Sequence, residues 1–304
     1  MSPGEPAAGS APASGWRWAA RLGGFVAVVF GGILVVSAAL VLLGAPATVA
    51  LDVWNVLPGV AVVLLASWWF TRLEHRTLAS LGLPGGVRMP RELGLGWLAG
   101  VALIGLVVVT LILLGWLSWT PEPGPGSRLA VGAGLTVLLL GAAFVEELLF
   151  RGYPFQVLER RFGAATAIVA TSVIFGAVHA LNPNFAALPA VNITLAGFLL
   201  AIAYWRTRSL WFVTGLHLGW NWTMALSELS VSGLPVEMPD YESRVTGPVL
   251  WTGGAFGPEG GLLVTVASLL GIVWMWRWRA EGESLSRHRD RRTDTGRGGS
   301  DRRG

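Results

Sequence analysis

The sequence predicts an all-α, polytopic membrane protein, and three observations support this fold class. Of its 304 residues, 53% are hydrophobic and only 13% are charged, about half the charged share of a typical soluble domain. The mean hydropathy is +0.59, and long apolar stretches follow one another along the chain. The basic residues fall almost entirely between alternate stretches. Together these features exclude a disordered chain, a nucleic-acid-binding protein and an ordinary soluble enzyme.

Eight apolar stretches are long enough to cross about 30 Å of hydrocarbon as helices. They lie at residues 22–44, 50–70, 93–116, 129–150, 164–182, 190–205, 209–228 and 261–278. We therefore expect about eight transmembrane helices in a single transmembrane domain over residues 16–279, with its longest loop at 229–260. The Pro/Gly/Ala/Ser-rich residues 1–15 and the basic residues 280–304 are predicted to be disordered.

The arginines indicate how these helices are oriented. All 22 basic residues are arginine, and with both termini in the cytoplasm only Arg128 and Arg244 fall outside cytoplasmic segments. This distribution obeys the positive-inside rule, so we expect an integral protein of the inner or plasma membrane with both termini cytoplasmic. The cytoplasmic loops would lie near residues 71–91, 151–163 and 206–208. Abundant Arg, Gly and Ala indicate a bacterial source.

An N-terminal signal peptide is the alternative interpretation of the first apolar stretch. Residues 16–47 carry two arginines before the apolar run and end in Ala45-Pro46-Ala47, which resembles a cleavage site. The apolar run exceeds 20 residues, however, whereas signal peptides usually have about 7–15. The sequence therefore favours a first transmembrane helix.

Polar side chains that are costly to bury in a membrane gather in or beside the stretches 129–150, 164–182 and 209–228. Such groups cost several kcal/mol unless they pair or line a wet cavity. They are Glu146, Glu147, Arg151, His179, His217 and Asn221. Because they lie at similar depths along neighbouring helices, we expect them to meet in one intramembrane active-site cavity.

Spacing along the fourth stretch separates the roles of two adjacent glutamates. Glu147 lies four residues before Arg151, the favourable order for an intrahelical ion pair. Glu146 and Glu147 lie about 100° apart around a helix, so we expect that they do not both point at one site. Glu147 is therefore predicted to pair with Arg151, and Glu146 to face the cavity.

Other interpretations of these polar side chains stay open. Either histidine alone is consistent with a hydrogen bond across a helix interface. The two acids and the arginine are consistent with a structural ion pair that takes no part in a reaction. Asn182 fits a helix cap or the border of the site, with capping favoured, and Asn192 fits a position near the membrane interface.

Three short motifs occur in order on successive apolar stretches. EELLFR at 146–151 fits EExxxR, FGAVH at 175–179 fits FxxxH, and HLGWN at 217–221 fits HxxxN. In these motifs the sequence resembles the CPBP family of intramembrane proteases, the CAAX-protease and bacteriocin-processing group also called the ABI family. The Ras-converting CAAX endopeptidases of eukaryotes belong to it. The motif-bearing core covers about residues 130–225.

The resemblance implies an eight-helix intramembrane endopeptidase whose catalytic residues lie in these motifs. It implies that Glu146 and His179 activate the attacking water, and that His217 and Asn221 stabilise the oxyanion. The remaining motif residues would have supporting roles: Glu147, Arg151 and Phe175. The expected partners are the lipid bilayer and a membrane-associated peptide or protein substrate, processed in the CAAX manner, and no nucleic acid.

We expect no cofactor, although the family is often labelled as metalloproteases. The chain has no HExxH motif and no cysteine, which excludes the usual zincin arrangement and a Cys-based metal site. A positioned carboxylate and imidazole suffice for general base catalysis. The alternative is a zinc site made by Glu146, His179 and His217 with one open position.

Two other function classes are consistent with a polytopic membrane protein. One is a non-catalytic scaffold or immunity protein that retains an old site, against which the intact motifs count. The other is a proton-coupled transporter with a Glu/His relay. Transporters often carry related features in both halves, whereas here the buried polar residues lie only between 146 and 221.

Overall fold

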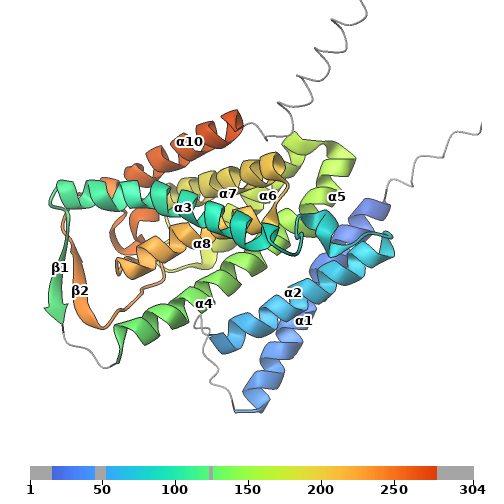
Figure 1. Cartoon of the computed structure of the whole chain (residues 1–304), viewed down its shortest axis with the longest axis horizontal. Helices are drawn as coiled ribbons and strands as arrows, with labels where there is room; N and C mark the ends of the chain where they lie inside the picture. Colours follow the sequence, from blue (N-terminus) through green and yellow to red (C-terminus); the bar gives the residue numbers. More distant parts are fainter. Residues whose placement is uncertain (1–15, 45–52, 123–125, 279–304) are drawn as a thin grey trace, which may run out of the picture.

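The computed structural model describes residues 16–44, 53–122 and 126–278. The ends predicted to be disordered and the cleavage site of the alternative signal peptide lie outside these ranges. Figure 1 shows a bundle of helices with a two-stranded ribbon at one end. The helices are α1 (Arg17–Leu42), α2 (Val53–Leu73), α3 (Arg88–Leu113), α4 (Arg128–Glu147), α5 (Tyr153–Phe162), α6 (Ala164–Val178), α7 (Ala187–Thr207), α8 (Leu210–Leu226), α9 (Val249–Thr252) and α10 (Leu262–Arg277).

The all-α membrane fold class is confirmed, with six helical segments long and apolar enough to cross a membrane among the described residues. They are Arg17–Leu42, Val56–Leu73, Arg88–Leu113, Arg128–Phe162, Ala164–Leu181 and Ala187–Thr207. The expected number of eight is not confirmed. The stretches 209–228 and 261–278 do form helices, but α8 and α10 have only 17 and 16 residues. A typical span needs about 20 residues.

The fourth predicted helix does not end near residue 150. It continues through a π-helical turn, η2 (Leu148–Gly152), directly into α5, so the loop predicted at 151–163 is wrong. Pro154 lies in the first turn of α5, where a missing backbone N–H costs nothing, and therefore it does not end the helix. As a result Arg151, which we expected in that cytoplasmic loop, is completely buried.

A short antiparallel ribbon was not expected from the sequence. Strand β1 (Leu117–Glu122) pairs with β2 (Asp240–Val245), in a register that places Leu117 opposite Val245. The second strand lies within the predicted loop at 229–260, which also contains α9 and two 3₁₀ turns, η4 (Gly254–Phe256) and η5 (Pro258–Gly260). In Figure 1 this ribbon lies at the end of the bundle opposite α5.

The helix ends that carry most of the described arginines lie together at the end of the bundle that includes α5 (Figure 1). Ion pairs join them: Glu74, just after α2, contacts Arg21 of α1 and Arg160 of α5. Glu159 of α5 contacts Arg208, just before α8. This arrangement agrees with the predicted separation of the arginines, and the membrane side on which this end lies stays a prediction.

Helix α8 lies at the centre of the bundle and packs very closely on α3. Every residue of α8 from Phe212 to Asn221 is buried. Gly96 and Gly100 of α3 meet Gly215 and Gly219 of α8, and a methyl group added at any of these four positions would overlap with the backbone of the other helix. Such paired GxxxG segments allow two membrane helices to approach without intervening side chains.

Candidate active site

Three segments of the bundle bring the predicted site residues together. The end of α4 with η2 carries the two glutamates and the arginine, the end of α6 carries the aromatic ring and one histidine, and the middle of α8 carries the other histidine and the asparagine. These residues are Glu146, Glu147, Arg151, Phe175, His179, His217 and Asn221. Most of them are linked by the direct contacts described below. The structure therefore brings these residues together, although only Phe175, His179, His217 and Asn221 line the cavity described below.

Glu147 is the centre of a buried chain of hydrogen bonds. Its Oε1 accepts a hydrogen bond from Nη1 of Arg151 at 2.9 Å and one from Nδ1 of His217 at 2.8 Å. Arg151 also donates to the carbonyl oxygen of Gly197 at 3.0 Å. Neither Glu147 nor Arg151 has any exposed side-chain surface, so the expected ion pair is present and it also holds α8 through His217.

Glu146 approaches the same imidazole from its other nitrogen. Its Oε2 lies 3.9 Å from Nε2 of His217 and has no hydrogen-bond partner among the described residues. The expectation that Glu146 and Glu147 do not share one site is wrong. An imidazole has two nitrogens that point in different directions, so one ring meets two carboxylates that leave the helix about 100° apart.

The two adjacent acids nevertheless differ in their environment. The side chain of Glu146 is 33% exposed, whereas that of Glu147 is 0% exposed. Glu147 makes two charge-assisted hydrogen bonds, which are roughly twice as strong as neutral ones. Oε2 of each glutamate has no hydrogen-bond partner among the described residues. The two acids differ in that Oε1 of Glu147 is held by Arg151 and His217, whereas the partly exposed Glu146 accepts no hydrogen bond from a described residue.

The ring of Phe175 lies between the side chains of Arg151, His179 and His217. Its ring centroid lies 4.7 Å from that of His179 and 6.0 Å from that of His217, and the Arg151 guanidinium lies 4.6 Å above the ring. Nδ1 of His179 lies 2.7 Å from the carbonyl oxygen of Phe175. A carbonyl only accepts, so Nδ1 of His179 carries the proton and its Nε2 is left for another partner.

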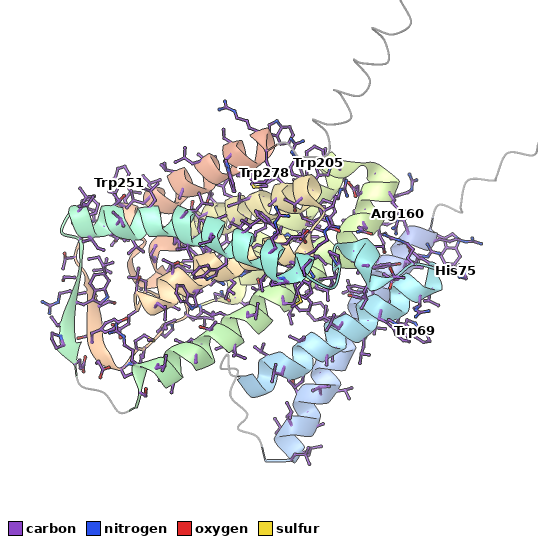
Figure 2. All side chains as sticks on the ribbon, in the orientation of Figure 1. Trp69, His75, Arg160, Trp205, Trp251 and Trp278 are labelled. Atoms are coloured by element: carbon purple, nitrogen blue, oxygen red, sulfur yellow. The ribbon has the colours of Figure 1, made fainter. Side chains whose placement is uncertain are left out.

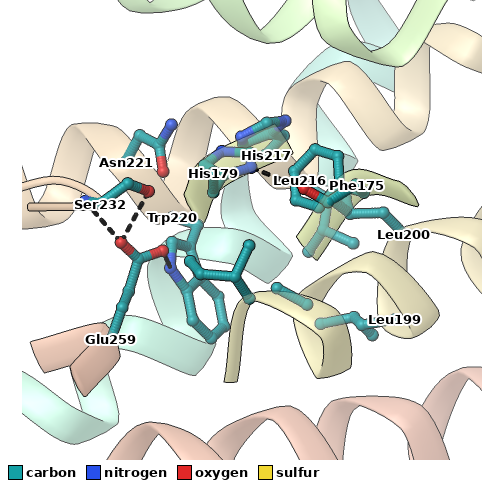
Figure 3. Close-up of a pocket in the computed structure, with 12 residues that line it drawn as sticks. Phe175, His179, Leu199, Leu200, Leu216, His217, Trp220, Asn221, Ser232 and Glu259 are labelled. Carbon is teal, nitrogen blue, oxygen red and sulfur yellow. Dashed lines mark hydrogen bonds between the residues drawn. The ribbon is translucent and has the colours of Figure 1, made fainter. Parts of the chain in front are cut away.

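A small cavity lies between these helices (Figure 3). About 20 Å³ is open to the centre of a water molecule, which is room for about one water. His179, His217 and Asn221 line it beside mostly apolar residues of α6, α7 and α8. Glu146 is not among the lining residues, contrary to the prediction, because α4 brings it to the edge of His217 instead.

Glu259 is a buried acid at this cavity that sequence reasoning did not select. Its carboxylate accepts hydrogen bonds from Nε1 of Trp220 at 3.0 Å, and from the backbone N and Oγ of Ser232 at 2.6 and 2.9 Å. Figure 3 shows this network closing one side of the cavity. The Gly/Pro-rich residues around Glu259 predicted a loop. The only feature of the sequence that could have pointed to Glu259 as a site residue was that it is a single acid within this run.

Two asparagines hold the same returning segment in place. Asn192 is 1% exposed and donates to the carbonyl oxygens of Glu259 and Gly261, and its position relative to the membrane interface stays a prediction. The side chain of Asn182 donates to the carbonyl oxygen of Ser232 at 2.8 Å. Asn182 therefore borders the site through its side chain, rather than only ending a helix.

In this structure the ligands of the alternative zinc site are not grouped at one position. Among the described residues, no three or more His, Cys, Asp or Glu side chains form a group that could hold a metal ion. The alternative ligands were Glu146, His179 and His217. The first of them does not line the cavity that the two histidines share.

Comparison with known proteins gives one family match. Residues 129–223 match the model of the Rce1-like family, described as type II CAAX prenyl endopeptidase Rce1-like. No curated protein matches the chain. The matched segment coincides with the core at about 130–225 and contains all three motifs, which confirms the family resemblance for that segment.

Proposed function

We propose that this protein is an intramembrane endopeptidase that hydrolyses a peptide bond of a membrane-associated substrate. The proposal starts from the Rce1-like match over residues 129–223 and from the membrane-spanning helices that carry that segment. The observation that supports it most directly is the difference between two adjacent acids at one imidazole. Glu146 is partly exposed and accepts no hydrogen bond from a described residue, while the fully buried Glu147 is held through Oε1 by Arg151 and His217.

In this proposal Glu146 turns from the edge of His217 toward the cavity when substrate binds, and there it acts as the general base. Water attacks the carbonyl carbon of the scissile bond while Glu146 takes one of its protons, and His179 orients the water through Nε2. Glu146 then gives the proton to the leaving amide nitrogen as the C–N bond breaks. A positioned acid–base group contributes about 10²- to 10⁴-fold to such a reaction.

His217 and Asn221 would stabilise the oxyanion that forms on the substrate carbonyl. Oε1 of Glu147 accepts from Arg151 and from Nδ1–H of His217, so His217 needs a second proton, on Nε2, to donate to the oxyanion. With His217 protonated, the two carboxylates balance Arg151 and His217. Proton transfer from water to Glu146 then creates the oxyanion without changing the net charge of the buried group. Burying an uncompensated charge would cost several kcal/mol.

Three finer features belong to the same proposal. The substrate is a membrane-associated peptide or precursor, the reaction needs no metal, and the arginine-rich end faces the cytoplasm of a bacterial cell. The small cavity has room for about one attacking water beside mostly apolar side chains. A non-catalytic scaffold remains the rival, and activity decides between them.

The test is a comparison of membrane peptides from cells that carry the wild-type protein or the Glu146→Gln variant. We expect precursor forms to accumulate and shortened products to disappear in the variant. Glu237→Gln is the matched control, because Glu237 is an exposed acid outside the site. If the peptides of Glu146→Gln cells equal those of wild-type cells at equal protein levels, the protease proposal fails.

A further inference from the structure

A second hollow lies at the arginine-rich end of the bundle, between the start of α1 and the end of α5. Its volume is about 210 Å³. It is lined by four arginines and one acid, together with Trp18 and Val157: the charged residues are Arg17, Arg21, Glu74, Arg160 and Arg161. The proposed proteolytic chemistry uses none of these residues.

The single acid of this hollow is already fully engaged. Glu74 contacts Arg21 at 3.1 Å and Arg160 at 2.8 Å, and Arg76 lies 3.6 Å from it. Its Oε1 also accepts a hydrogen bond from the hydroxyl of Tyr153 at 2.8 Å. One carboxylate therefore serves three guanidinium groups and leaves a clear excess of positive charge.

Two arginines of the hollow have no counter-charge within the part of the chain that the structure describes. Among the described residues, neither Arg17 nor Arg161 makes an ion pair. Arg17 and Arg21 lie four residues apart on α1, where like charges repel and destabilise the helix. An anion bound in the hollow would attract both arginines and so offset the repulsion between them.

Aromatic packing between α1 and α5 forms one side of the hollow. Trp18 of α1 packs edge-on against Phe162 at the end of α5, with ring centroids 4.8 Å apart. The guanidinium of Arg161 lies 5.0 Å from the same Phe162 ring. Arg160, labelled in Figure 2, lies at this end of the molecule. This aromatic contact keeps Arg17 and Arg21 of α1 close to the two arginines at the end of α5.

We infer that this hollow binds the phosphate group of an anionic phospholipid. Guanidinium groups are the preferred partners of phosphate, because their planar donors match its oxygens. The site lies where α1, a helix that can span the membrane, begins, so a headgroup there keeps its acyl chains beside the apolar faces of α1. Basic pockets between membrane helices are known to hold anionic headgroups. The inference does not depend on proteolytic activity.

The test measures lipid retention by native mass spectrometry on the purified full chain. Detergent micelles would be supplemented with equal amounts of phosphatidylglycerol and phosphatidylcholine. The pocket variant is Arg17→Gln/Arg161→Gln, which breaks no ion pair among the described residues. The control is Arg72→Gln/Arg91→Gln, which removes the same charge from two exposed positions outside the hollow but at the same end of the bundle.

We expect the wild type and the control to retain phosphatidylglycerol in preference to phosphatidylcholine. The pocket variant should bind phosphatidylglycerol roughly 10- to 30-fold more weakly. Equal retention of the two lipids by the wild type, or equal loss in both variants, would overturn the inference. A thermal-shift series with inorganic phosphate identifies the source of the anion. Stabilisation by phosphate as strong as that by phosphatidylglycerol, and absent in the pocket variant, would indicate a soluble anion and reject the lipid.

Discussion

Glu146 and Glu147 show how far the surroundings of a residue determine what it can do. They are identical in type and adjacent in sequence, yet one is 33% exposed and the other is completely buried between Arg151 and His217. In a low-dielectric interior, removing one partner of a buried pair leaves the other charge uncompensated. The two positions should therefore respond differently to the same isosteric substitution.

We predict that Glu147→Gln destabilises the protein by about 3–5 kcal/mol, because it leaves Arg151 buried without a counter-charge. Glu146→Gln should leave the melting temperature nearly unchanged while cleavage is abolished. Thermal unfolding in detergent, followed by a peptide-cleavage assay, measures both effects. A stable but inactive Glu147→Gln variant beside an active Glu146→Gln variant would reverse the assigned roles.

Asn221 provides a test of the oxyanion site. It lines the cavity beside His217 and is 9% exposed. We predict that Asn221→Ala lowers kcat about 10²- to 10³-fold with little change in KM, because an oxyanion donor acts in the transition state. Single-turnover kinetics with a cleavable peptide separate the chemical step from binding. A rise in KM at unchanged kcat would instead assign Asn221 to substrate binding.

The metal-free proposal makes its own prediction at the same residues. Prolonged incubation with EDTA or phenanthroline should leave turnover unchanged, and elemental analysis should find no stoichiometric zinc. The reason is that Glu146 is the base in the proposed mechanism and is not needed there as a ligand. Loss of activity with chelator, restored by added zinc, would contradict this prediction.

At the scale of elements, the glycine contact between α3 and α8 positions half of the site. His217 lies between Gly215 and Gly219, and both glycines touch the backbone of α3. The position of the imidazole relative to α4 therefore depends on how closely α8 approaches α3. Membrane helices gain little from the hydrophobic effect between them, so close van der Waals packing matters more than in water.

We predict that Gly219→Ala destabilises the protein by about 1–3 kcal/mol and lowers activity, because the added methyl group overlaps with the backbone at Trp97. Gly94→Ala is the matched control, since its added methyl group meets no atom within 4 Å. The control should be neutral or slightly stabilising, as expected for Gly→Ala inside a helix. Equal melting temperatures for the two variants would show that the close contact is unimportant.

At the scale of the whole molecule, the arginine-rich helix ends and the β1–β2 ribbon lie at opposite ends of the bundle. The positive-inside rule then predicts that the ribbon lies outside the cytoplasm. Because the chain has no native cysteine, a single introduced cysteine reports its own location.

We predict that Glu242→Cys in β2 is labelled by a membrane-impermeant maleimide in intact cells. Ala79→Cys, in the 71–91 segment near the arginine-rich end, should be labelled only after the membrane is opened. Both positions are exposed. The reverse pattern would invert the proposed orientation and place the arginine-rich end outside.

The sequence by itself determined the features that depend on local pattern. Apolar stretches predict membrane helices wherever the chain must satisfy its own backbone hydrogen bonds in lipid. The spacing of Glu147 and Arg151 predicts their ion pair, because residues four apart meet on any helix. The three motifs likewise identified the residues of the candidate site, because each motif is a short pattern within one segment of the chain.

Only the tertiary structure decided how those segments meet. Glu147 contacts His217 across 70 positions of sequence, and Glu259 returns to Trp220 and Ser232 from a segment that its Gly/Pro content marked only as a loop. Burial of Asn192 and continuation of the fourth helix past Pro154 likewise depend on neighbouring elements. Local patterns do not specify such contacts, because their energies arise only after distant helices have packed and excluded lipid and water.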